Sequence, residues 1–221
     1  MRKYALNACV QGFVLFMVTV LSACTHNATI KLTETSTNPT HTGSAMGKIA
    51  VFALYGNDEF ELRALVENTI TKQMQQEGID VTPGYRFSDS YQDLENRLEE
   101  LDNWLVNNDI DGILFVDPVR AKAFDPREHA ERRSAYRALG LSSAALVNLI
   151  SSSAQESDAS KYVMDITLWD RRSMDYTWYG IYDIKANHGY DPEWIKKHLS
   201  DFSQAIVGEL KQQGLVLTSK P

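Results

Sequence analysis

Cysteine chemistry in this sequence rests on two residues, Cys9 and Cys24. Cys24 ends a run of apolar residues, and a polar, threonine-rich stretch follows it. A cysteine in that position can be a buried thiol, a reactive nucleophile or an attachment point for another group. If residues 1–23 are removed, Cys24 is the one remaining thiol, which excludes an intramolecular disulfide and a Cys-rich zinc site.

The residues before Cys24 have the layout of a secretory signal peptide. Arg2 and Lys3 give a positive start, residues 13–21 form an apolar core, and the small residues Ser22 and Ala23 precede the cysteine. A helix built from that core rises only about 14 Å. The hydrocarbon layer of a membrane is about 30 Å thick, so residues 1–23 indicate a cleaved leader and not a transmembrane anchor.

The sequence Leu-Ser-Ala-Cys ending at Cys24 resembles the lipobox of bacterial lipoproteins. The resemblance implies that Cys24 becomes the first residue of the mature chain and carries a diacylglyceryl group on sulfur and an acyl chain such as palmitate on its amine. This covalent lipid is the only cofactor expected, and several chains make anchoring durable. Thr25, where an Asp would favour the inner membrane, implies the outer membrane, on its periplasmic side. The alternative is an ordinary secretory signal with a chance cysteine.

Charged and histidine-containing clusters give no clear catalytic set. Residues 127–133 read Arg-Glu-His-Ala-Glu-Arg-Arg, which is not the HExxH zinc pattern. This stretch is either a solvated helix face or a docking surface for an acidic partner or anionic headgroups. The arginines that such a surface would use are Arg127, Arg132, Arg133 and Arg137. A Ser-His-Asp triad remains open in principle, but without a GxSxG pattern nothing marks a nucleophile, and we expect a protein that is not an enzyme.

Aromatic residues gather in a predicted hairpin at Trp169, Trp178, Tyr179 and Tyr182. One interpretation buries them, with one face of the hairpin in the core and the other covered by a helix. The other leaves an exposed patch that binds a partner or a glycan.

The net charge is −7, and residues 1–23 contribute Arg2 and Lys3 without an acid, so the chain from Cys24 onward carries −9. Such a chain repels phosphate backbones, and we expect no nucleic-acid partner. Residues 24–46 have few large apolar side chains. That composition predicts a disordered, threonine-rich tether, which would hold the domain roughly 25 Å from the membrane.

Hydrophobic periodicity from residue 47 to 218 predicts one α/β domain with three layers and a mixed, mostly parallel sheet. A long helical insertion is expected at 118–160, where an extended connection often carries function. The expected elements are a strand at 48–54, a helix over Leu62–Met74 closed by Gly78, an edge strand at 79–87, a helix over Leu94–Leu105, a strand at 111–117, a hairpin at 162–184 and a helix opened by Asp191 and closed by Gly214.

This element order, with Asp170 leading into a strand that carries Trp178 and Gly180, is similar to a group of periplasmic lipoprotein domains. The group includes the N-terminal domain of the Tol translocation protein, the curli secretion lipoprotein, the lipoprotein activator of penicillin-binding proteins and an exopolysaccharide-export lipoprotein. The resemblance implies non-catalytic work with envelope proteins, in secretion, polysaccharide export or cell-wall synthesis. A glycan ligand and a homo-oligomer are further possible partners.

Overall fold

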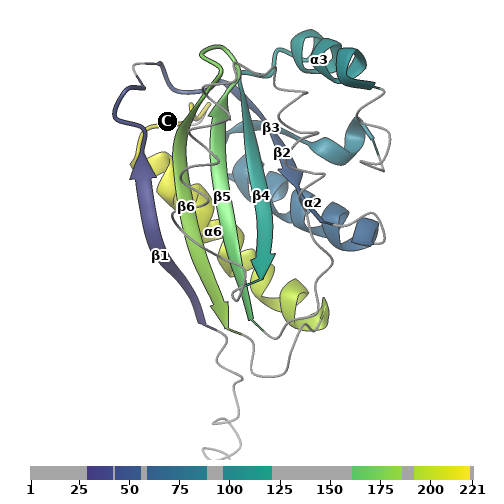
Figure 1. Ribbon diagram of the computed structural model, residues 1–221, viewed down its shortest axis with the longest axis vertical. Helices are drawn as coiled ribbons and strands as arrows, with labels where there is room; N and C mark the ends of the chain where they lie inside the picture. The colour runs from purple at the N-terminus through teal and green to yellow at the C-terminus, as the bar shows by residue number, and fades with distance from the viewer. Residues whose placement is uncertain are drawn as a thin grey trace, which may run out of the picture.

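The structure is a computed structural model that describes residues 29–41, 43–55, 59–88, 97–120, 161–185 and 192–219. These residues form a single α/β domain around a six-stranded mixed sheet (Figure 1). The elements are β1 (Thr29–Thr37), β2 (Lys48–Ala53), α2 (Phe60–Gln76), β3 (Asp80–Pro83), the 3-10 turn η2 (Gly84–Arg86), α3 (Leu98–Asn107), β4 (Gly112–Arg120), β5 (Lys161–Asp170), β6 (Asp175–Lys185) and α6 (Pro192–Gln212).

The strand order across the sheet is β1-β6-β5-β4-β2-β3. β2 pairs in parallel with both β3 and β4, whereas the three other pairings, β4 with β5, β5 with β6, and β6 with β1, are antiparallel. The α/β class and the mixed sheet were predicted correctly, but the expectation of a mostly parallel sheet was wrong. The reason is that the chain leaves β4 at Arg120 and re-enters β5 opposite that point, with Arg120 facing Tyr162, so β5 must run back along β4.

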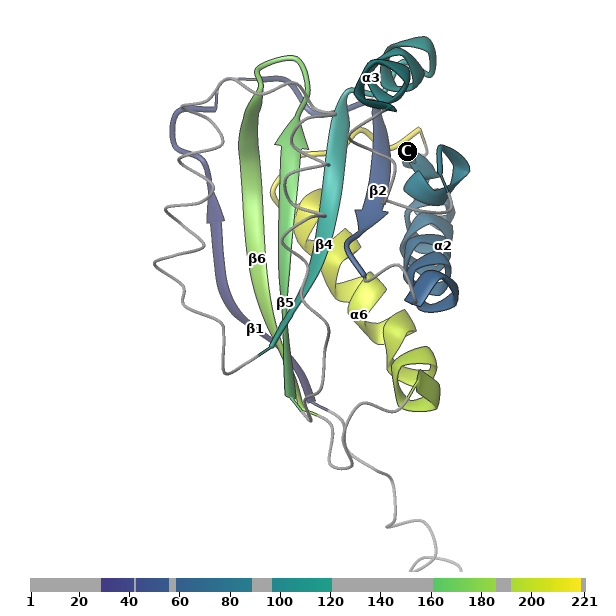
Figure 2. The same cartoon turned by 45° about the vertical axis from the view of Figure 1, so that its right-hand side comes forward.

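Helices cover the sheet on two sides, which gives the three layers that the sequence predicts. α2 and α6 lie on one face (Figures 1 and 2), where they enclose a core containing Ile70, Leu168, Trp178 and Phe202. α3 supplies Leu101 and Leu105 to a second core on the opposite face, together with Phe52, Phe115 and Trp169. No helix among the described residues is long and apolar enough to cross a membrane.

Glycine ends α2 as predicted. Gly78 has φ 78°, a left-handed backbone conformation that a residue without Cβ adopts without strain. Its N–H donates to the carbonyl of Gln75 at 3.0 Å, and the Ile79 N–H donates to the carbonyl of Met74 at 3.0 Å. These bonds satisfy the last carbonyls of the helix and turn the chain directly into the edge strand β3.

A buried ion pair joins α2 to the sheet. One carboxylate oxygen of Glu67 accepts hydrogen bonds from the Ala53 N–H and from Arg63 Nε, each at 3.0 Å, and the other accepts from the Tyr85 N–H at 2.7 Å. Burial raises the pKa of Glu67, although Arg63 and the backbone donors oppose that shift. The side chain therefore fixes α2 against the end of β2 and the start of η2.

The structure corrects the prediction of a disordered tether over 24–46 for the part that it describes, residues 29–41 and 43–46. Thr29–Thr37 form β1, an edge strand that pairs with β6 from Thr29 opposite Lys185 to Thr37 opposite Trp178. Ile30 and Leu32 pack on the core beneath α6, and the remaining residues of β1 need little apolar surface because one side of an edge strand faces solvent. Threonine is itself a good strand former, so the composition that resembles a tether also suits an edge strand.

The boundary of the predicted insertion also differs. Residues 118–120 belong to β4, which runs as far as Arg120, instead of to an insertion beginning at 118. The rest of that predicted insertion, residues 121–160, lies outside the described residues.

Candidate functional site

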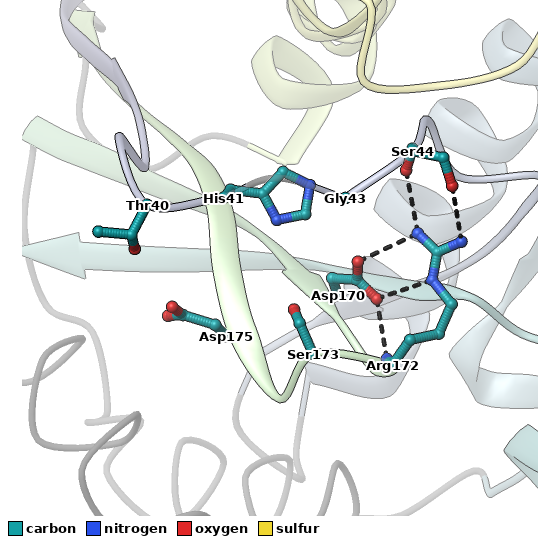
Figure 3. Close-up of a pocket in the computed structure, with 8 residues that line it drawn as sticks. All are labelled: Thr40, His41, Gly43, Ser44, Asp170, Arg172, Ser173 and Asp175. Atoms are coloured by element: carbon teal, nitrogen blue, oxygen red, sulfur yellow. Dashed lines mark hydrogen bonds and ion pairs between the residues drawn. The ribbon is translucent and has the colours of Figure 1, made fainter.

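A pocket of about 320 Å³ lies where residues 38–44 cross the turn between β5 and β6 (Figure 3). The turn is short, and Met174 takes φ 57° within it. The chain leaving β1 reaches the turn because β1 and β6 are paired up to Thr37 and Trp178. The lining residues are Thr40, His41, Gly43, Ser44, Asp170, Arg172, Ser173 and Asp175.

An ion pair between Asp170 and Arg172 forms one wall of this pocket. Arg172 Nε lies 3.0 Å from Asp170 Oδ1, Arg172 Nη2 lies 3.0 Å from Oδ2, and the Arg172 N–H donates to Oδ1 at 2.8 Å. Burial by itself raises the pKa of Asp170, but the hydrogen bonds and charge of Arg172 outweigh it and hold that pKa below its ordinary value. The same pair raises the pKa of Arg172.

The guanidinium of Arg172 also holds the crossing segment. Arg172 Nη2 donates to the Ser44 carbonyl at 3.0 Å, and Nη1 approaches Ser44 Oγ at 3.3 Å (Figure 3). One arginine thus joins the end of β5 to a residue 128 positions earlier in the chain. This link makes the pocket wall a structural clamp on the segment that leads into β2.

Asn38 secures the other end of the crossing segment. Its side chain is buried, and Nδ2 donates to Asp175 Oδ2 at 2.9 Å and to the Tyr176 carbonyl at 2.8 Å. Its Oδ1 accepts from the Thr40 N–H at 3.1 Å and the Thr40 hydroxyl at 2.8 Å. These bonds turn the chain away from β1 and over the hairpin.

His41 borders the pocket beside Asp170, although the sequence places it in a solvated tether (Figure 3). Gly43 makes this approach possible, because a Cβ there would collide with Cε1 of His41 and would lie 3.2 Å from Asp170 Oδ2. The residue types of a Ser-His-Asp triad therefore meet here, with Ser173 on the same pocket. Among the described hydrogen bonds, however, none joins His41 to a serine or to Asp170, whose oxygens accept from Arg172. The arrangement suits binding of a small polar group more than nucleophilic attack.

The two tryptophans predicted as partner-binding residues are buried, so that prediction is wrong for both. Trp169 is 1% exposed and packs under α3, whereas Trp178 is 0% exposed, lies on the opposite face and donates from Nε1 to Thr35 Oγ1 at 2.8 Å. Strand alternation explains the split, because Trp178 faces Leu168 across the ladder and Trp169 is the next residue along β5. Tyr179 is partly exposed, and its hydroxyl donates to Glu34 on β1.

The other predicted site residues lie outside the described residues. They are Cys24, Arg127, Arg132, Arg133 and Arg137. Within the described ranges, no group of three or more His, Cys, Asp or Glu side chains is arranged to hold a metal ion.

A second, more open groove of about 480 Å³ lies between η2 and α3, at a place where the sequence pattern predicts no site. The Phe87 and Trp104 rings lie 5.8 Å apart between centroids, and the Arg97 guanidinium lies 4.7 Å from the Phe87 ring centre. The rim is polar and includes Glu100, Asn103, Asn107 and Asn108. The sequence of α3 does contain an indication of this groove. Trp104 directly precedes the buried Leu105, so it lies at the edge of the apolar stripe, where a large side chain stays partly accessible.

Comparison with known proteins adds nothing to the description of the fold. No protein-family model and no curated protein matches the chain. Two solved structures of PelC dodecamers from Paraburkholderia phytofirmans are distantly similar. One is 11% identical with a TM-score of 0.36, covering 82% of this chain and 98% of that one, and the other is 10% identical with a TM-score of 0.34, covering 87% and 100%. A likeness of this size supports no conclusion about the assembly or function of this chain.

Proposed function

We propose that this protein is a lipoprotein anchored in the outer membrane, on its periplasmic side, and that it acts there without catalysis as an assembly, scaffolding or regulatory factor. The observation that carries the non-catalytic role is the clamp at the hairpin turn. Asp170 and Arg172, two of the charged groups that line the pocket with His41, are occupied with each other and with Ser44. They stabilise the domain instead of presenting a free acid or base to a substrate.

The anchoring rests on the leader and the Leu-Ser-Ala-Cys sequence that ends at Cys24. Its partners are other envelope proteins, and further copies of the same chain are candidates among them. The arginines between 127 and 137 are the proposed contact with an acidic partner surface, since they stand out from a chain of negative net charge.

Metabolic labelling with an alkyne analogue of palmitate tests the anchor. The wild-type protein should incorporate the label and fractionate with outer membranes, whereas Cys24→Ala should do neither. An unlabelled wild-type protein released in soluble form would contradict the proposal.

A pull-down tests the partner contact. The variant Arg132→Glu/Arg133→Glu/Arg137→Glu should lose the proteins that the wild type captures, while its melting temperature stays unchanged. Retained capture would remove this contact from the assignment.

The groove at Phe87 and Trp104 favours a second candidate function, binding of a glycan or another small envelope ligand. A partly exposed indole beside several amide side chains offers a stacking surface together with hydrogen-bonding groups. Titration with peptidoglycan fragments and polysaccharides should change the tryptophan fluorescence of the wild type but not that of Trp104→Phe. Val106→Ala, an exposed position on α3 outside the groove lining, is the matched control. No response across the panel would exclude this function.

A further inference from the structure

The short spacing between Cys24 and β1 has a consequence for how the domain meets the membrane. We infer that the sheet end formed by Thr29, Lys161 and Lys185 lies against anionic phospholipid headgroups, with the hairpin-turn pocket held at the far end of the sheet. This inference rests on the proposed lipid anchor at Cys24.

Covalent reach sets the first limit. Thr29, where β1 begins, lies five positions after Cys24, with four residues between them. A fully extended chain spans at most about 3.5 Å per residue, so Thr29 lies within roughly 18 Å of the anchored cysteine. A 20-residue tether would have let the domain take any orientation, whereas this spacing keeps the start of β1 at the membrane surface.

The strand register shows what else lies at that end. Thr29 faces Lys185 across the β1–β6 ladder, and Lys185 faces Lys161 across the β5–β6 ladder. Arg120 ends β4 opposite Tyr162, the neighbour of Lys161, so the same end of four adjacent strands meets there. α6 also begins at this end of the molecule (Figure 1).

Charge is distributed unevenly between the two ends of the sheet. The basic residues at the Thr29 end are Lys31, Arg120, Lys161, Lys185, Lys196 and Lys197. Asp183, opposite Lys31, and Glu193 in the first turn of α6 are acidic residues of the same region, so the strand and helix residues described at this end are net positive. Basic residues near a bilayer are attracted to anionic lipids and their contributions add. The attraction is notable because the chain beyond the leader is acidic overall.

The opposite end carries the pocket. Asp170 faces Asp175 in the last pair of the β5–β6 ladder and Gly112 in the first pair of the β4–β5 ladder. β1 alone advances about 27 Å between Thr29 and Thr37 at the usual rise for strands. The clamp, the pocket and α3 therefore face away from the bilayer, where a partner in the periplasm can reach them.

Site-directed labelling of the full, lipidated protein in vesicles tests the orientation. Cys24 is blocked by its lipid, so an introduced cysteine is the one free thiol of the mature chain. A fluorophore on Thr29→Cys should be quenched at least twofold more strongly by headgroup-labelled lipid than one on Val106→Cys, in vesicles of phosphatidylethanolamine and phosphatidylglycerol. Equal quenching at the two positions would overturn the orientation.

The charge contribution is measured in the same system. Quenching at Thr29→Cys should fall when phosphatidylcholine replaces the anionic lipid, and also with Lys161→Glu/Lys185→Glu. Lys72→Glu, an exposed lysine on α2, is the control and should change nothing. If quenching changes neither with the lipid charge nor with Lys161→Glu/Lys185→Glu, the proposed headgroup contact is overturned. Palmitate labelling of the same samples separates the two proposals: labelled protein with equal quenching contradicts only the orientation, and unlabelled protein contradicts both.

Discussion

At the scale of single residues, the most informative group is Asp170, because its charge and its burial act in opposite directions. It is 1% exposed and still has a lowered pKa, since Arg172 contributes two side-chain hydrogen bonds and one from its backbone. A buried carboxylate so completely satisfied acts mainly in folding. It determines whether residues 38–44 stay on the hairpin turn.

We expect Asp170→Asn to lower the free energy of unfolding by about 2 kcal/mol, because the amide cannot accept both guanidinium bonds. The lowered folded-state pKa means that ionised Asp170 stabilises the fold above its ordinary pKa, and that this stability is lost as pH falls through the folded-state pKa. Urea unfolding from pH 7 to pH 3 should therefore show a smaller acid-induced loss in Asp170→Asn than in the wild type. Identical pH slopes would contradict the assignment.

Gly180 shows why Trp178 and a glycine occur two residues apart. A Cβ at position 180 would lie 2.6 Å from Cη2 of Trp178 and 2.7 Å from its Cζ2, so the indole occupies the space that any side chain would need. We expect Gly180→Ala to destabilise the protein by about 1–3 kcal/mol, measured by thermal unfolding. Gly208→Ala in α6, where a Cβ meets no atom within 4 Å, should instead be neutral or slightly stabilising. Equal effects of the two changes would argue against this packing.

At the scale of elements, β1 is the strand that its own residue composition does not predict. Leu32 faces Tyr182 across the ladder and packs on the core beneath α6. We expect Leu32→Asp to lower the free energy of unfolding by about 2 kcal/mol, because it places a charge against that core. Ser36→Asp, an exposed position on the same strand, should change stability by no more than about 0.5 kcal/mol. If both variants unfold like the wild type, residues 29–37 do not form part of the folded sheet.

Glu67 joins α2, β2 and η2, so removing its carboxylate should weaken the contacts among all three. Glu67→Ala leaves Arg63 charged and buried and frees the N–H groups of Ala53 and Tyr85, so we expect a loss of about 3–5 kcal/mol. Removing both charges with Arg63→Met/Glu67→Met should cost less than the sum of the single changes, as a double-mutant cycle would show. Additive single changes would contradict a shared ion pair.

The raised pKa of Glu67 affects the pH dependence of stability in the opposite direction from the lowered pKa of Asp170. The contribution of Glu67 to stability declines as pH rises from its ordinary pKa through its folded-state pKa.

At the scale of the whole molecule, the two hydrophobic cores lie on opposite faces of one sheet. Trp178 reports on the face under α2 and α6, and Trp169 reports on the face under α3. The sheet therefore couples the two layers, and we expect a single cooperative unfolding transition in urea. In a variant that retains only Trp169, and in one that retains only Trp178, the fluorescence midpoint should coincide with the circular-dichroism midpoint of that same variant. Separate midpoints would show that α3 and its core unfold independently.

The sequence by itself determined most of the local structure. Apolar alternation predicted the hairpin and the buried strands, helical spacing predicted α2 and α6, and Gly78 and Gly214 were expected at helix ends, where both have positive φ. These signals are reliable because the side-chain period of a strand or helix reports directly which of its faces is buried. The α/β class followed from the order of those elements.

Only the tertiary structure decided which strands pair, which tryptophans are buried and where the pocket lies. Residues 29–37 carry too few apolar residues to fold alone, and they become a strand because β6 supplies an edge with unpaired backbone groups. The pocket likewise joins His41 and Ser44 to Asp170 and Arg172 across more than 120 positions of sequence. Local periodicity does not predict such contacts. They depend on which distant segment completes the hydrogen bonds of each element and which one covers its apolar face.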